Sequence, residues 1–239
     1  MNGLAHDWIV PAWPAPARVK ACITTRAGGV SVAPFDSLNL GTHVGDDPVA
    51  VKKNRQRLVS QLGCKPAWLQ QVHGLGVVEA LPEMLAEADA SWTATPGIAC
   101  TVMTADCLPA LFCDRGGSRV AAAHAGWRGL AAGVLEATLD ALAVAPEDTL
   151  VWLGPAIGPQ AFEVGTEVRE AFLAQHARRS RPLAPASTPV AIWRISISWR
   201  VFAWPPAGSM RSTAAIAAPT ATHASTLTVA LRKPAASPA

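Results

Sequence analysis

The sequence is poor in charge and has no long hydrophobic run. Charged residues make up 15% of the chain, whereas soluble domains average about 25%. The net charge of +3 is small and the basic residues are scattered, so we expect no nucleic-acid partner. No apolar run reaches the roughly 18 residues that cross a bilayer, and residues 1–19 lack the basic start and apolar block of a signal peptide. We therefore expect no membrane partner and no secretion.

The sequence also lacks any Cys-x-x-Cys pair, the spacing typical of structural zinc sites and redox motifs. Its five cysteines are an odd number, which cannot all pair within one chain. This usage predicts free thiols in a reducing, cytoplasmic setting. The cysteines are Cys22, Cys64, Cys100, Cys107 and Cys113.

Alternating and periodic apolar residues predict a mixture of strands and helices. We expect strands over residues 19–25, 68–73, 97–104, 118–124 and 149–155. We expect helices over residues 49–62, 129–144 and 164–175, where apolar residues recur at helical spacing. With 239 residues the chain is long enough to bury a full core. Strands mixed with single helices indicate one α/β (α+β) domain.

One cysteine and two histidines lie in short polar motifs next to apolar runs. Cys107 follows Asp106, His124 ends an apolar run, and His73 stands before a glycine. A thiolate and two imidazoles are a ligand set that zinc accepts, with a fourth position left open for water or substrate. Each residue also has a plainer interpretation, because Cys107 alone is typical of a small buried side chain and His124 of a core or capping histidine.

Several short polar motifs follow one another along the chain. They include Thr24-Thr25-Arg26-Ala27-Gly28-Gly29, Ser37-Leu38-Asn39-Leu40-Gly41, Gln71-Val72-His73-Gly74, Ala88-Asp89-Ala90, Thr104-Ala105-Asp106-Cys107 and His124-Ala125-Gly126-Trp127-Arg128-Gly129. These motifs, in this order, resemble the YfiH-like family of laccase-domain proteins over roughly residues 15–175. The resemblance implies a single layered domain of mixed β-sheets flanked by helices, related to bacterial cysteine-hydrolase toxins. It also implies a purine nucleoside phosphorylase that acts on adenosine, inosine and methylthioadenosine with phosphate, with adenosine deaminase as a side activity.

The resemblance places the family's metal ligands on His73, Cys107 and His124, with zinc as the expected ion and copper as the alternative. We expect Cys107, His124 and Asp106 to be the catalytic residues, with Asp106 as the first candidate for the general acid or base. The sequence does not indicate an oligomeric state.

Three further polar residues are candidates for substrate binding. Arg26 and Arg128 are expected to hold phosphate or ribose, because guanidinium groups match phosphate oxygens. Each could equally pin a turn to a neighbouring carboxylate. Asn39 is a candidate polar group of the pocket, and its alternative role is that of a turn residue.

Three different functions compete with the phosphorylase. A copper-dependent polyphenol oxidase fits the family's older name, although the chain has no His-x-His pair. A metal-free hydrolase would use Cys107 as nucleophile and His124 as base. The third possibility is an inactive product with a damaged C-terminus.

The C-terminal residues 177–239 depart from the family's pattern. Family members end with an Asp-Leu pair, a Cys-Thr motif, Phe-x-Ser-x-Arg-Arg and Thr-Gly-Arg, and none of these occurs here. If the reading frame is shifted one base upstream, the codons of this segment permit all four motifs. In that frame, residues 225–230 allow Phe-Tyr-Ser-Tyr-Arg-Arg, for example. The complete lack of tyrosine fits, because regrouping restores several. We therefore expect a catalytic domain over residues 1–176 and an aberrant, poorly ordered segment over 177–239, with a frameshift between about residues 176 and 192.

Overall fold

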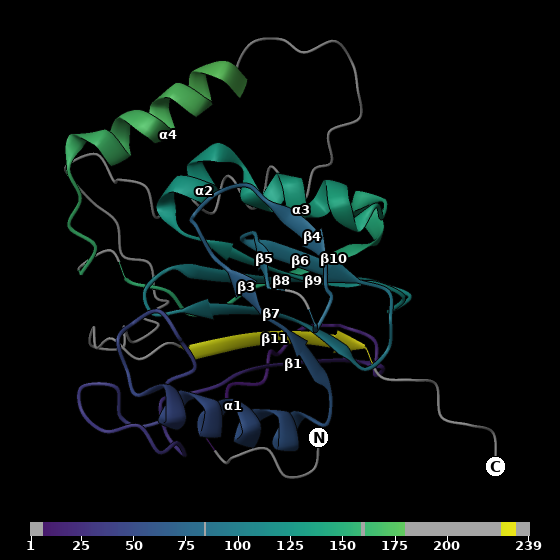
Figure 1. Cartoon of the computed structure of the whole chain (residues 1–239). Helices are drawn as coiled ribbons and strands as arrows, with labels where there is room; N and C mark the ends of the chain where they lie inside the picture. The colour runs from purple at the N-terminus through teal and green to yellow at the C-terminus, as the bar shows by residue number, and fades with distance from the viewer. Residues whose placement is uncertain (1–6, 84, 159–160, 180–225, 233–239) are drawn as a thin grey trace, which may run out of the picture.

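The computed structural model describes residues 7–83, 85–158, 161–179 and 226–232. These residues form four layers (Figure 1): a helix, two β-sheets and a further layer of helices. The helices are α1 Pro48–Leu62, α2 Trp127–Ala132, α3 Val134–Leu142 and α4 Thr166–Arg179. The strands are β1 Val19–Ile23, β2 Lys65–Ala67, β3 Leu69–Gln70, β4 Val77–Glu79, β5 Ala86–Glu87, β6 Ala90–Thr93, β7 Ile98–Thr104, β8 Leu108–Asp114, β9 Val120–Ala125, β10 Thr149–Leu153 and β11 Thr226–Arg232.

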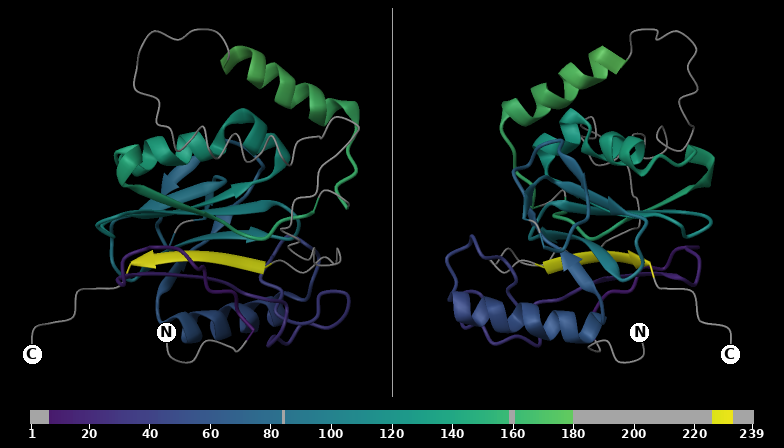
Figure 2. Two further views of the ribbon diagram at one scale, coloured as in Figure 1. Left: turned by 180° about the vertical axis from the view of Figure 1, so that it is seen from behind. Right: turned by 45° about the vertical axis from the view of Figure 1, so that its right-hand side comes forward.

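The two larger sheets are mixed and lie face to face (Figures 1 and 2). The first has the order β1-β11-β7-β2, in which β2 runs parallel to β7 and the other neighbours are antiparallel. The second has the order β10-β8-β9-β6-β4, with β4 parallel to β6. A separate pair, β3 with β5, is parallel. The prediction of an α/β domain with mixed sheets flanked by helices is therefore confirmed.

Three apolar clusters fill the spaces between the four layers. The cluster between the sheets includes Val102, Leu111 and Val120. A second cluster packs Leu58 and Leu62 of α1 against the first sheet, and a third packs Leu135 and Leu142 of α3 against the second. Because both faces of the second sheet are covered, its central strands β8 and β9 are buried along their whole length and are mostly apolar.

The helix expected over residues 129–144 is two helices in the structure. Gly133 has a φ of 111°, a left-handed conformation that ends α2 and begins α3. Glycine adopts this conformation without the steric cost that a Cβ imposes. The helix expected over residues 49–62 is confirmed as α1, whose N-terminal cap is Asp47 and whose C-terminal cap is Gly63 with a φ of 61°.

One strand prediction needs correction, and one fully buried strand was not predicted. The strand expected over residues 68–73 is confined to β3, Leu69–Gln70, and the following residues turn away with His73 at a φ of 60°. In contrast, the fully buried strand β8 was not predicted, because Pro109 near its start argues against a central strand. Pro109 lies at the end of the pairing with β10: its carbonyl oxygen accepts from Gly154 N at 2.9 Å, and its lack of an N–H leaves out only the return bond of this last pair.

The division into a domain over residues 1–176 and an aberrant segment over 177–239 stays a prediction, because the structure describes only residues 177–179 and 226–232 of that segment. Helix α4 continues to Arg179, and β11 lies between β1 and β7 in the first sheet. Most of the segment predicted to be frameshifted falls outside the described residues, so that hypothesis stays a prediction. No helix among the described residues is long and apolar enough to cross a membrane.

Candidate metal centre

The three predicted ligands come from three different places in the fold. His73 lies in the loop after β3, Cys107 in the connection from β7 to β8, and His124 near the end of β9. The connection that carries Cys107 joins one large sheet to the other. Antiparallel pairing of Leu108 with Ala125 then brings Cys107 alongside the end of β9.

The ligand atoms of these three side chains converge. One nitrogen of each histidine and the Cys107 sulfur all lie within 4.8 Å of one another, and His73 Nε2 is 3.9 Å from Cys107 Sγ. Zinc bonds of about 2.0–2.1 Å to nitrogen and 2.3 Å to sulfur, at tetrahedral angles, separate such atoms by about 3.6 Å. The donor set and its spacing therefore fit one zinc ion with small adjustments.

The exposure of the three side chains forms a gradient. His124 is buried at 3% exposure, Cys107 is half-buried, and His73 is exposed. The two imidazole rings meet edge to face at 82°, with centroids 4.6 Å apart. The site is thus closed on the side of β9 and open on the side of His73, which suits an ion that keeps a position for an exchangeable ligand.

The buried carboxylate of Asp89, just before β6, sets the electrostatics of the site. Burial opposes the charged form of His124, but its hydrogen bonds to Asp89 and Cys107 raise its pKa to about 9. Burial likewise favours neutral Asp89, yet the hydrogen bonds from His124 and from Gly74 lower its pKa below the usual value. The metal-free site therefore holds a buried ion pair, His124 Nδ1 to Asp89 Oδ1 at 2.8 Å.

The pKa of His73 shifts in the opposite direction to that of His124. Burial and the neighbouring His124 lower its pKa, Arg128 and His43 act in the same direction, and Asp89 opposes them. A neutral imidazole is the form that binds a metal. His43 and Arg128 therefore lie close enough to the site for their charges to act on it.

Gln71 fastens the loop of His73 to the strand that leads to Cys107. Its amide donates to the carbonyl oxygen of Met103 at 2.8 Å and its side-chain oxygen accepts from Met103 N at 2.7 Å. This paired contact fixes the distance between the loop after β3 and the end of β7. The sequence alone assigned Gln71 no role, although this residue lies in the motif of His73.

Gly126 leaves the space in which the ligands meet. A Cβ at this position would lie 2.6 Å from His73 Cδ2 and 3.2 Å from Cys107 Sγ, well inside normal contact distance. Gly126 is also the N-cap residue of α2. Any side chain here would intrude on two of the three ligands.

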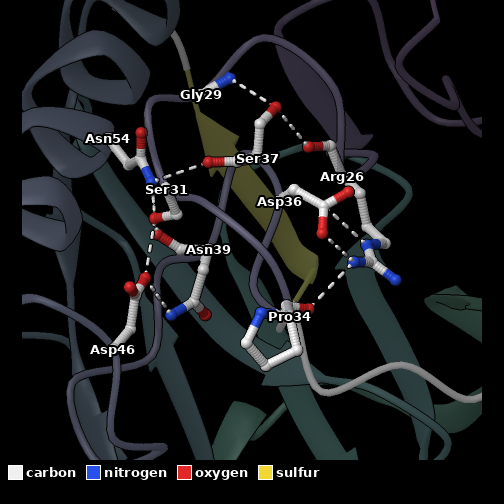
Figure 3. A network of polar contacts seen from close by, with 9 residues as sticks. All are labelled: Arg26, Gly29, Ser31, Pro34, Asp36, Ser37, Asn39, Asp46 and Asn54. Carbon is white, nitrogen blue, oxygen red and sulfur yellow. Dashed lines mark hydrogen bonds and ion pairs between the residues drawn. The ribbon is translucent and has the colours of Figure 1, made fainter.

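The predicted substrate residues Arg26 and Asn39 make contacts within their own loop (Figure 3). Arg26 donates to the carbonyl oxygens of Asp36 and Pro34 and pairs with the Asp36 carboxylate at 3.5 Å. Asn39 is fully buried and donates to Asp46 Oδ2 at 2.9 Å. These contacts match the turn-forming role, and a role in substrate binding stays a prediction for both.

Asn54 of α1 is the centre of the same loop network. It is fully buried, accepts from Val30 N, and donates to Ser31 Oγ, Ser37 O and Asn39 O at 2.9–3.1 Å. A single amide therefore holds the long loop between β1 and α1. The helix periodicity of α1 did not single out Asn54, because a polar residue among exposed charges carries no signal.

The remaining predicted residues are neighbours in sequence of the predicted ligands. Asp106 precedes Cys107, its side chain is half-buried, and its carbonyl oxygen accepts from Ile157 N. Arg128 is exposed, and its guanidinium lies 4.5 Å from the centre of the Trp127 ring. The cysteines other than Cys107 are buried free thiols, as predicted for core residues.

Comparison with known proteins assigns the family. The model of a family described as multi-copper polyphenol oxidoreductase laccase matches residues 20–198. The chain belongs to this laccase-domain, YfiH-like family. The resemblance inferred from the motifs is thereby confirmed.

Curated relatives of this family carry the name purine nucleoside phosphorylase. One from Pseudomonas aeruginosa is 69% identical over 184 residues, which cover 77% of this chain and 76% of the relative. The Escherichia coli relative, purine nucleoside phosphorylase YfiH, is 61% identical over 176 residues, or 72% of each chain.

Solved structures share the fold. A Neisseria meningitidis protein superposes with a TM-score of 0.78 at 40% identity, covering 95% of this chain and all of that one. YlmD from Geobacillus stearothermophilus gives a TM-score of 0.72 at 27% identity, covering 97% and 98%.

Proposed function

We propose that the protein is a purine nucleoside phosphorylase with a zinc ion held by His73, Cys107 and His124. The observation that carries the proposal is the convergence of these ligand atoms within 4.8 Å, in a chain 69% identical to a protein of that name. The proposed substrates are adenosine, inosine and methylthioadenosine, together with phosphate. Adenosine deamination is the proposed side activity, and copper is the alternative metal.

Phosphorolysis joins a phosphate oxygen to the ribose anomeric carbon and breaks the bond from that carbon to the purine nitrogen, which leaves with a proton. A bound zinc ion supplies Lewis acidity and lowers the pKa of a water ligand. Asp89 accepts the Nδ1 proton of His124 and so leaves Nε2 as the nitrogen available to a metal.

The residues around the ligands supply charge and protons. Arg128, whose charge acts on His73, is the proposed group that attracts the phosphate anion. Arg26 and Asn39 are the other proposed substrate-binding residues, and their contacts hold the loop between β1 and α1. Asp106 is the proposed group that exchanges a proton with the leaving purine, because it stands beside Cys107 with a half-buried side chain. A cytoplasmic setting belongs to the same proposal, since Cys107 must remain a free thiol.

The test measures ribose-1-phosphate and free purine from adenosine and phosphate, together with the zinc content of the purified protein. We expect Cys107→Ala to lose both zinc and phosphorolysis. Cys64→Ala is the matched control, because it removes a buried thiol at the end of α1 that is not part of the ligand cluster. Unchanged phosphorolysis in Cys107→Ala would exclude the site.

A metal-free hydrolase is a second candidate, and one observation favours it. Asp89 bonds to His124, and His124 interacts with Cys107, which is the order of a nucleophile, a base and an orienting carboxylate. Against it, His73 lies 3.9 Å from Cys107 with no role in such a triad. Hydrolysis that persists after complete removal of zinc would support the hydrolase.

The oxidase and the inactive product each have a test of their own. The family's description names a multi-copper polyphenol oxidoreductase. A polyphenol oxidase of that kind would require copper and would consume oxygen. An inactive product would show no activity until the reading frame after residue 176 is restored. Resequencing the gene decides whether the frame is shifted.

A further inference from the structure

We propose that Asp89 is the positioning residue of the metal centre, because one carboxylate holds two of the three ligands in place. The inference rests on the proposed zinc site and goes beyond it, since Asp89 is not a ligand in the cluster. Asp89 would hold the two histidines in position before a metal ion binds.

Asp89 fixes the ring of His124. The side chain of Asp89 is fully buried, and its Oδ1 lies 2.8 Å from His124 Nδ1. The backbone joins the same two residues, because His124 N donates to Asp89 O at 2.7 Å. The ring can therefore neither flip nor change tautomer without breaking a buried, charge-assisted hydrogen bond.

Asp89 also fixes the loop that carries His73. Three consecutive amides donate to its carboxylate: Val72 N at 3.2 Å, His73 N at 2.9 Å and Gly74 N at 2.6 Å. Such a run of amides around an anion is a nest. The nest supports the φ of 60° at His73, a conformation that is unfavourable for a non-glycine residue and persists only where the surroundings enforce it.

Only a carboxylate satisfies these contacts. Oδ1 accepts from His73 N and His124 Nδ1, and Oδ2 accepts from Val72 N and Gly74 N. Four donors therefore use the roughly four lone-pair sites of the group. In Asp89→Asn, an NH₂ group would face two of these donors, so either the loop or the ring would lose its support.

The shared carboxylate makes the two histidines depend on each other. A change at Asp89 shifts His73 and His124 together, whereas a change at either histidine removes one ligand. We therefore expect Asp89→Asn to weaken zinc binding by about 100-fold, the upper end of the range for partners of metal ligands. In a His73→Ala background the same change should cost less, because one of the two positioned ligands is already gone.

The first experiment measures zinc affinity by competition with a chromophoric chelator, and the coordination by the visible spectrum of the Co²⁺-loaded protein. Asp114→Asn is the matched control: Asp114 is also buried and accepts from Ser118 Oγ and Arg119 N, but at the other end of β8. We expect the control to bind zinc as the wild type does, and Asp89→Asn to lose affinity with an altered Co²⁺ spectrum. Equal affinity and spectra in Asp89→Asn and the wild type would overturn the inference.

A second measurement needs no variant and remains decisive if Asp89→Asn does not fold. In the metal-free wild type, the amides of Val72, His73 and Gly74 should exchange slowly with deuterium although the side chains of Val72 and His73 are exposed. Rapid exchange of all three would overturn the inference. A wild type that keeps these amides protected yet binds no zinc would instead overturn the proposed function.

Discussion

Gly126→Ala is the smallest change that tests the metal centre. The added methyl group would lie 2.6 Å from His73 Cδ2 and 3.2 Å from Cys107 Sγ. Optimal contact between such atoms is about 3.5–4.0 Å, so the ring of His73 must retreat by roughly 1 Å. Because Gly126 has a φ of −62° and is the N-cap residue of α2, the backbone itself accepts alanine.

The displacement is large compared with the tolerance of a metal site. Bond lengths at such sites hold to about 0.2 Å, so a shift of roughly 1 Å takes His73 out of bonding distance. We expect zinc affinity to fall by at least the roughly 10- to 100-fold that loss of an outer partner costs. The free energy of unfolding should change by no more than about 1 kcal/mol, the usual effect at a helix N-cap.

The assay is chelator competition on the purified variant, with thermal unfolding of the metal-free protein as a measure of the fold. Gly74→Ala is the matched control from the loop of His73, because its Cβ would meet Val72 Cγ2 at 3.5 Å, an ordinary contact. We expect the control to retain zinc. Gly126→Ala with wild-type zinc affinity would show that His73 is not a ligand, or that the loop moves freely.

Three further predictions use different parts of the molecule. Iodoacetamide should label Cys107 first and zinc should protect it. Cys107 is half-buried, whereas burial raises the pKa of each of the other four thiols to about 11 or 12, and equal labelling by mass spectrometry would contradict this. The free energy of unfolding of the metal-free protein should fall as pH rises from about 6.5 through about 9, since the pKa of His124 is raised in the folded state. It should also fall in acid, as Asp89 with its lowered pKa becomes protonated. Denaturant midpoints measured with chelator present check the acid and the alkaline range. Asn54→Ala should lower the free energy of unfolding by about 2 kcal/mol or more by leaving buried partners unpaired, whereas exposed Lys53→Ala should change it by under about 0.5 kcal/mol.

The sequence predicted those parts of the fold whose signal is local. Helix α1 follows from its apolar spacing, and strands β7 and β9 follow from continuous apolar runs. Strand β8 escaped prediction because Pro109 is a local signal against a strand, and only its place at the end of the β10 pairing shows why it is tolerated. The break at Gly133 escaped because the apolar spacing continues across it.

The residues of the site likewise differ in whether a local sequence signal reveals them. The sequence could propose Cys107, His73 and His124 as ligands, because their residue types suit zinc and their motifs resemble those of a family, and the structure brings the three side chains together. Asp89 and Gly126 were not given roles, because their importance lies in what they touch. An aspartate between alanines and a glycine before a helix are ordinary locally, and only tertiary contacts distinguish them.

Groups that are not ligands hold the ligands in place without a metal. Gln71 ties the loop of His73 to Met103, and Asp89 ties that loop to His124. A structural zinc site differs, since its ligands usually order only when the ion binds and the chain unfolds without it. The contacts here therefore fit a reactive centre with an exchangeable fourth position, in which removal of the metal should abolish chemistry while the fold persists.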